Sequence, residues 1–142
     1  GPKVIEYNCR FGDPETEVVL PCLESDIYDI FEAIATGRKI EKIEWSDKAV
    51  IGVVLASKGY PGDYEKGYAI ENLENVDGKM YHMGTALKDG KIVTAGGRVM
   101  IVVCMGDDLK AAQDKVNAEV AKIECENLFY RKDIGSKAFK KI

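Results

Sequence analysis

The residues best suited to chemistry stand near the start of the chain, in the run Glu6-Tyr7-Asn8-Cys9-Arg10. Polar residues alternate with β-branched or aromatic ones over residues 4–11, which predicts a β-strand whose side chains two apart share a face. Glu6, Asn8 and Arg10 would form one polar row. Carboxylate and amide oxygens are ligands that Mg²⁺ accepts, and a guanidinium beside them suits a transferring phosphoryl group. A solvated strand face with one Glu–Arg pair explains the same row.

The predicted strand stops at Gly12-Asp13-Pro14, and the same residues predict the start of a helix. Proline suits the first helical position because its missing N–H would have no intrahelical partner there. This makes Asp13 the expected N-cap. Glu15 and Glu17 then fall in the first turn, where carboxylates meet the positive end of the helix dipole.

Two later stretches are rich in glycine, residues 57–67 and Gly96-Gly97-Arg98. Neither has the Lys-Ser or Lys-Thr ending of a P-loop, and the first is expected to be an ordered loop. Beside Gly97, Arg98 offers a bidentate fork for a phosphate or carboxylate ligand, but an arginine at the start of a strand is more often the partner of a salt bridge at the rim of the sheet. His82 alternates with apolar neighbours, which favours a core or edge histidine over an acid–base catalyst.

Composition narrows the class of protein. The chain has 142 residues, 31% of them charged, and a net charge of −4, which argues against a nucleic-acid partner or a membrane surface. No apolar run reaches the roughly 20 residues of a membrane span. The four cysteines and single histidine lack zinc-site spacing, and Cys9 and Cys104 fall in predicted strands. Buried free thiols fit a reducing cytoplasm, which is the expected location.

The first 41 residues are predicted to form one strand and two helices. Residues 18–23 suggest a short helix that Pro21 kinks or ends. Asp26 caps a second helix with apolar residues at positions 27, 30, 31 and 34, and Gly37 ends it. A single strand needs sheet neighbours, so this unit either belongs to a larger fold or docks on the second unit of the chain. The charged residues 38–48 mark the predicted domain boundary, giving units 1–41 and 42–142.

The sequence pattern of the second unit predicts a small α+β domain. Strands are expected at residues 49–56, 79–83, 85–87, 92–95 and 98–105, with a type I′ turn at Asp89-Gly90. Asp107 or Asp108 should cap a helix whose apolar face includes Val116 and Val120. The tail 129–142 is expected to add a strand or turn and a last helical turn. The overall class is therefore α+β, with a mostly antiparallel sheet and packed helices.

Several of these stretches resemble the phosphoribosylamine–glycine ligase family, the glycinamide ribonucleotide synthetases of the ATP-grasp superfamily. The similarity is most specific over Arg10–Glu15, preceded by Glu6 and Asn8. Glu17 departs from it, since many members have Gln there. Matching runs continue to the end of the chain, at residues 56–64, 82–85, 96–99 and 129–135.

The resemblance implies that residues 1–41 are the tail of an ATP-grasp domain and residues 42–142 the small C-terminal domain of the ligase. It also implies the reaction of de novo purine biosynthesis that joins glycine to 5-phosphoribosylamine through a glycyl phosphate, giving glycinamide ribonucleotide, ADP and phosphate. Glu6 and Asn8 would bind Mg²⁺ or Mn²⁺, and Arg10 would stabilise the phosphoryl group or acyl phosphate. Asp13 and Glu15, with Arg98, are expected at the substrates.

No segment suits an adenine or a lid over the triphosphate, so the chain alone is expected to be inactive and to need the N-terminal part of the same enzyme. Two alternatives stay open. One is a stand-alone binding or subunit-interaction module derived from an ATP-grasp enzyme, which would have a well-packed first strand. The other is a different ATP-grasp enzyme, such as a carboxylase.

Overall fold

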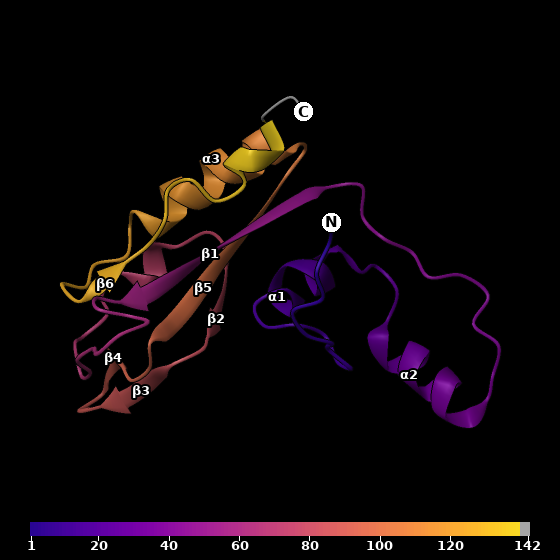
Figure 1. Ribbon diagram of the computed structural model, residues 1–142, viewed down its shortest axis with the longest axis horizontal. Coiled ribbons are helices and arrows are strands. Elements are labelled where there is room, and N and C mark those ends of the chain that lie inside the picture. The colour runs from indigo at the N-terminus through magenta and orange to yellow at the C-terminus, as the bar shows by residue number, and fades with distance from the viewer. Residues whose placement is uncertain (140–142) are drawn as a thin grey trace.

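The computed structural model describes residues 1–139 and confirms the α+β class. A four-stranded antiparallel sheet has the order β2-β5-β1-β6 and is built from β1 (Ala49–Ser57), β2 (Lys79–His82), β5 (Arg98–Gly106) and β6 (Leu128–Phe129). A separate hairpin joins β3 (Thr85–Lys88) to β4 (Lys91–Thr94). Positive φ angles at Asp89 and Gly90 confirm the predicted type I′ turn. The α-helix α3 (Leu109–Val120) lies along the sheet (Figure 1).

The core lies between α3 and one face of β1 and β5. Because side chains alternate along a strand, Val53 and Val102, which pair across the two strands, both face the helix side. Val116 on α3 packs against them, and all three are almost fully buried. As predicted, Asp108 caps α3 by accepting a hydrogen bond from the amide of Ala111.

The first helices are short and lie outside this core. The helix α1 (Thr16–Val19) passes directly into the 3-10 turn η1 (Leu20–Cys22), so Pro21 ends the regular helix as predicted. The helix α2 (Ile27–Thr36) begins at Asp26, whose carboxylate accepts from the Tyr28 amide, and ends at Gly37 with φ of 70°. Both predicted caps are confirmed. Figure 1 shows α2 set apart from the sheet.

Two shorter 3-10 turns complete the described chain, η2 (Leu73–Asn75) and η3 (Ser136–Phe139). The tail that holds η3 is fixed to α3, because Gln113 donates its Nε2 to the carbonyl of Ile134 at 2.7 Å. Among residues 1–139, no helix is long and apolar enough to cross a membrane.

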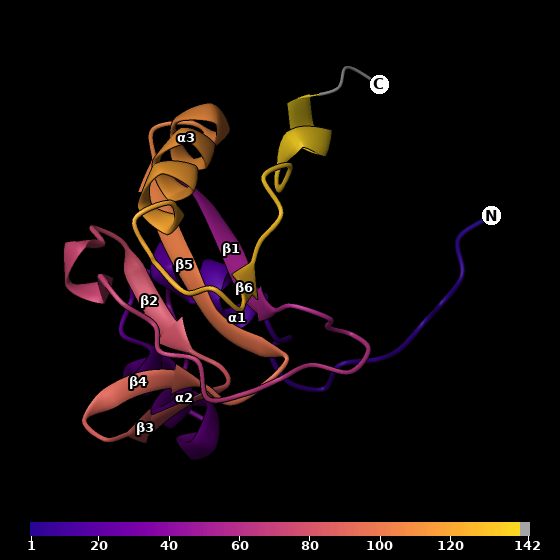
Figure 2. The same cartoon turned by 90° about the vertical axis from the view of Figure 1, so that its left-hand side faces the viewer.

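Four predictions about the first segment are wrong, and one of them is that Pro14 takes the first helical position, which Thr16 occupies. Residues 4–11 form no strand: they are exposed, with a bend of the chain at residues 9 and 10, and without a ladder partner, because the described chain offers no neighbouring strand there. Cys9 is consequently exposed, whereas Cys104 on β5 is buried as predicted. Asp13 is not the cap of α1; that position belongs to Glu15, and its side chain makes no capping hydrogen bond. Figure 2 shows the N-terminal segment leading away from the sheet.

Candidate functional site

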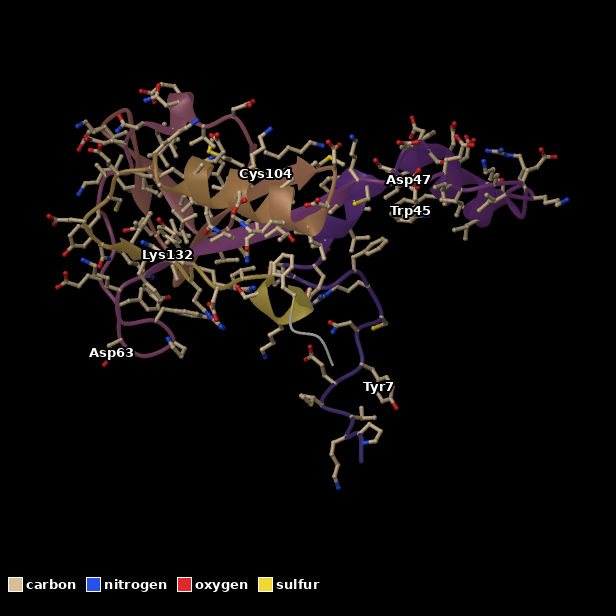
Figure 3. All side chains as sticks on the ribbon, turned by 90° about the horizontal axis from the view of Figure 1, so that it is seen from above. Tyr7, Trp45, Asp47, Asp63, Cys104 and Lys132 are labelled. Carbon is tan, nitrogen blue, oxygen red and sulfur yellow. The ribbon has the colours of Figure 1, made fainter. Side chains whose placement is uncertain are left out.

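The polar row expected from the sequence exists as neighbouring side chains, although its backbone is not a strand. The Asn8 side chain donates Nδ2 to Glu6 Oε1 at 3.0 Å, and Arg10 donates to the carbonyl of Phe11 at 2.9 Å. All of these residues are exposed. The apolar residues of the same segment are exposed too, with Ile5 at 96% and Tyr7 at 88% of their full accessible surface. Figure 3 shows Tyr7 on the part of the chain that leads away from the domain.

Glu6 and Asn8 fit part of a magnesium site. Turning the Asn8 amide over would place its oxygen where the nitrogen now contacts Glu6, giving two neighbouring oxygen ligands of the type that Mg²⁺ binds. Mg²⁺ takes six ligands in an octahedron, often including substrate phosphates and water. Within residues 1–139, no group of three or more His, Cys, Asp and Glu residues is placed to hold a metal ion. Glu6 and Asn8 would therefore supply only two of the ligands, and other groups would have to supply the rest.

The turn after this row is held by an ion pair with the sheet. Arg98, the first residue of β5, donates to both carboxylate oxygens of Asp13, at 3.0 Å to Oδ1 and 3.2 Å to Oδ2. It also donates to the backbone carbonyl of Asp13 at 3.3 Å. The two residues are 85 positions apart. The salt bridge considered for Arg98 is present, and its partner lies in the motif.

The backbone beneath Arg98 is fixed by close packing of glycines. A β-carbon on Gly84 would lie 2.5 Å from the Arg98 carbonyl oxygen and 2.8 Å from Cα of Gly96. The carbonyls of Gly96 and Gly97 accept from the hydroxyl and the amide of Ser57, each at 2.8 Å, and Ser57 is fully buried. A side chain on Gly84 would therefore prevent this close backbone approach, whereas a β-carbon on Gly97 would lie only 2.2 Å from Cδ2 of the Tyr60 ring.

A hollow of about 490 Å³ opens beside the ion pair, lined by Asp13, Glu17, Tyr60, His82, Met83 and Arg98. His82 is exposed, as an edge histidine would be, and its Nδ1 lies 2.9 Å from the hydroxyl of Thr85. The Oε2 atom of Glu17 is buried, and within residues 1–139 it has no hydrogen-bond partner. Glu17 thus adds a second carboxylate to this hollow, beside the paired Asp13.

The structure thus brings the predicted site residues together in two places. Glu6 and Asn8 meet on the exposed segment, and Asp13 and Arg98 meet at the hollow, while the Glu15 side chain folds back over Gly12. Tyr60 also lines this hollow, a place that its residue type and spacing in the sequence do not predict. An available signal was its place in the loop 57–67, whose glycines mark an ordered turn-rich segment.

Comparison with known proteins identifies the family. A family model described as the C domain of phosphoribosylglycinamide synthetase matches residues 50–137. The chain belongs to this family. The family predicted from its motifs is therefore confirmed.

Similar proteins agree with this assignment. The chain is 53% identical to a phosphoribosylamine–glycine ligase of Halalkalibacterium halodurans and 51% identical to that of Caldanaerobacter subterraneus, over 97% and 96% of its length. It is also 47% identical to the trifunctional purine biosynthetic protein adenosine-3 of Gallus gallus. The chain spans about a third of the two bacterial ligases, at 32% and 33% of their lengths, and 14% of the trifunctional protein.

A solved structure gives the same result for the fold. The crystal structure of phosphoribosylamine–glycine ligase from Thermotoga maritima superposes with a TM-score of 0.83 and 37% sequence identity. The alignment covers 94% of this chain and 34% of that one. The arrangement of sheet, hairpin and helices is therefore that of the corresponding third of a ligase.

Proposed function

We propose that this chain works as the C-terminal part of an ATP-dependent phosphoribosylamine–glycine ligase, together with an N-terminal part of the same enzyme. The observation that carries the proposal is the exposed row of Glu6, Asn8 and Arg10, attached to a domain that belongs to this family. The apolar residues of the same segment, Ile5 and Tyr7, are also exposed, which suits a segment that another part of the enzyme covers. The proposed reaction consumes ATP, glycine and 5-phosphoribosylamine.

In this proposal the exposed row serves phosphoryl transfer. Glu6 and Asn8 would hold Mg²⁺ or Mn²⁺, which supplies charge neutralisation between phosphate groups when bound. Arg10 would donate hydrogen bonds to the transferring phosphoryl group as glycine becomes a glycyl phosphate, and so stabilise charge without moving a proton. The Arg10 guanidinium makes one hydrogen bond among the described residues, to the neighbouring carbonyl of Phe11, which leaves most of its donors for this role.

The turn after the row would lie at the amine-bearing substrates. Asp13 and Glu15 are acceptors for amino groups, and the Asp13 carboxylate is already oriented by Arg98. The amine of 5-phosphoribosylamine would attack the acyl carbon of glycyl phosphate, releasing phosphate and forming glycinamide ribonucleotide. Adenine recognition would fall to the N-terminal part, and the present chain alone is expected to be inactive.

A stand-alone binding module remains the second candidate. That alternative expects the first segment to be a well-packed strand of a self-sufficient domain. The segment instead forms no strand and is exposed over residues 4–11, which favours the ligase.

The test is a chimera in which this chain replaces the matching third of the Halalkalibacterium halodurans ligase, to which it is 53% identical. We expect ADP release that requires both glycine and 5-phosphoribosylamine. The same chain without the other two thirds should give none. A folded chimera that binds ATP and releases no glycine-dependent ADP would contradict the proposal.

Point variants of the chimera test the roles proposed for Arg10 and Glu6. Arg10→Ala should lower kcat by about 10²-fold or more, because a donor aimed at developing charge is lost. Glu6→Ala should raise the Mg²⁺ concentration needed for half-maximal activity. Glu74→Ala is the matched control, an exposed carboxylate on η2 outside the motif, and should leave both quantities unchanged.

A further inference from the structure

The contacts between Arg98 and Asp13 are the only hydrogen bonds or ion pairs described between residues 1–41 and residues 49–139. Every other polar contact of the first segment is internal or goes to residues 44–46. One guanidinium therefore forms the polar connection between the turn after the Glu6–Arg10 row and the sheet domain.

Each end of this connection is fixed by its own surroundings. Arg98 stands opposite Ala56 in the sheet, and its neighbours Gly96 and Gly97 are bound to Ser57. Asp13 belongs to the turn that leads into α1, where the amide and hydroxyl of Thr16 both donate to the carbonyl of Gly12. Because both backbones are fixed, a side chain that bonds one to the other can hold the turn at a defined position on the sheet.

The energetics favour a geometric role over a stabilising one. The side chains of Arg98 and Asp13 are 36% and 51% exposed, and exposed ion pairs add little to stability. A bidentate guanidinium–carboxylate pair with a third bond to the backbone carbonyl nevertheless fixes distance and orientation. The main effect of the ion pair is therefore to fix the position of Asp13.

We infer that Arg98 is a positioning residue, which acts through Asp13 to hold the Gly12–Glu15 turn in place on the sheet domain. The guanidinium is neutralised by Asp13, and the adjacent hollow also holds the Glu17 carboxylate, so the site does not favour an anionic ligand of Arg98. The claim that Arg98 holds the turn in place depends only on the observed ion pair. Its catalytic consequence, correct placement of the substrates at Asp13, rests on the proposed function.

Hydrogen exchange on the chain itself tests the structural part. Arg98→Ala should speed amide exchange at Thr16, whose amide donates to Gly12, while exchange in β1 and β5 stays unchanged. The control is Arg131→Ala, which removes the similar exposed bidentate pair with Asp133 and should leave Thr16 unaffected. Unchanged exchange at Thr16 in Arg98→Ala would overturn the inference.

A double-mutant cycle in the chimera tests the catalytic part. If Arg98 acts through Asp13, then Arg98→Ala should lower kcat with little change in the KM for ATP. The double variant with Asp13→Ala should be no slower than Asp13→Ala alone, within about twofold. Arg98→Lys, which keeps the charge and loses the fork, should restore only part of the rate. If the losses of kcat in the two single variants multiply in the double variant, Arg98 acts independently of Asp13 by contacting a ligand itself, and the inference is overturned.

The two experiments separate the two proposals. Faster exchange at Thr16 with an inactive wild-type chimera would contradict the proposed function and support the structural link. An active chimera whose Arg98→Ala variant shows unchanged exchange and unchanged kcat would support the function and exclude the positioning role.

Discussion

Val18 on α1 packs so closely against Gly52 on β1 that a β-carbon added to Gly52 would lie only 2.8 Å from Cγ1 of Val18. The same added carbon would stand 2.7 Å from Cδ1 of Ile101 on β5. The first helix therefore rests directly on the backbone of the sheet, on the face opposite α3. With the Asp13–Arg98 pair, this apolar contact determines where the N-terminal segment joins the domain.

Gly52→Ala should displace α1 from the sheet. We expect about 1–3 kcal/mol of destabilisation, because an added methyl in a filled interface forces its neighbours to shift. Chemical denaturation measures the loss, and hydrogen exchange at Val19 reports the displacement. Adding Val18→Ala should relieve part of the effect by removing the clashing methyl. A Gly52→Ala variant as stable as the parent would show that the interface is loosely packed.

Removing Glu119 should destabilise the α3–β2 connection. Its carboxylate, 9% exposed, accepts from the amide of Asp77 at 2.6 Å and from Lys122 at 2.7 Å. Glu119→Ala would leave the Asp77 amide without its acceptor, at an expected cost of about 1–3 kcal/mol by urea denaturation. Asp114→Asn, which breaks an exposed pair with Lys110 on the same helix, should stay within about 0.5 kcal/mol.

Glu119 should also make stability depend on pH. The hydrogen bond from Lys122 lowers the pKa of Glu119 below its ordinary value of 4.5, and the bond from the Asp77 amide acts in the same direction. A carboxyl whose pKa is lower in the folded state contributes stability above its unfolded pKa. That contribution is lost as the pH falls below 4.5 and through the folded pKa. Denaturation curves of Glu119→Gln should show a weaker pH dependence over this range; an identical slope would contradict the assignment.

The helix α2 should depend strongly on its N-cap, because most of it lies outside the core. Asp26→Ala should reduce the helical circular-dichroism signal and cost α2 about 0.5–2 kcal/mol, whereas Asp26→Asn should retain most of the helix. Hydrogen exchange at Ile30, whose amide donates to the Asp26 carbonyl, locates the change. Equal signals in both variants would show that α2 is held by other contacts.

The cysteines should differ in reactivity. Cys9 is exposed and should react rapidly with a thiol reagent in the folded chain. Burial raises the pKa of the Cys104 thiol, which lowers its thiolate fraction, so Cys104 should react only when the domain unfolds. Mass spectrometry after timed labelling distinguishes the two, and Cys9→Ser removes the fast phase. Rapid labelling of Cys104 in the folded state would contradict the described core.

The sequence alone determined the elements whose signals are local. The caps at Asp26 and Asp108, the turn at Asp89-Gly90 and the apolar runs of β1 and β5 depend on residues close in the chain, and all formed where predicted. The family followed from the motif between Arg10 and Glu15 and its companions, because such runs are specific without any knowledge of contacts.

Tertiary structure decided the features that depend on distant partners. Residues 4–11 have the pattern of a strand, yet a strand forms only beside another strand, and none adjoins it among the described residues. Asp13 has the sequence context of a cap, but Arg98, 85 positions away, takes its carboxylate. The local sequence pattern limits the conformations and contacts that a residue can adopt. Long-range contacts decide among them, because they depend on residues whose position the local spacing does not specify.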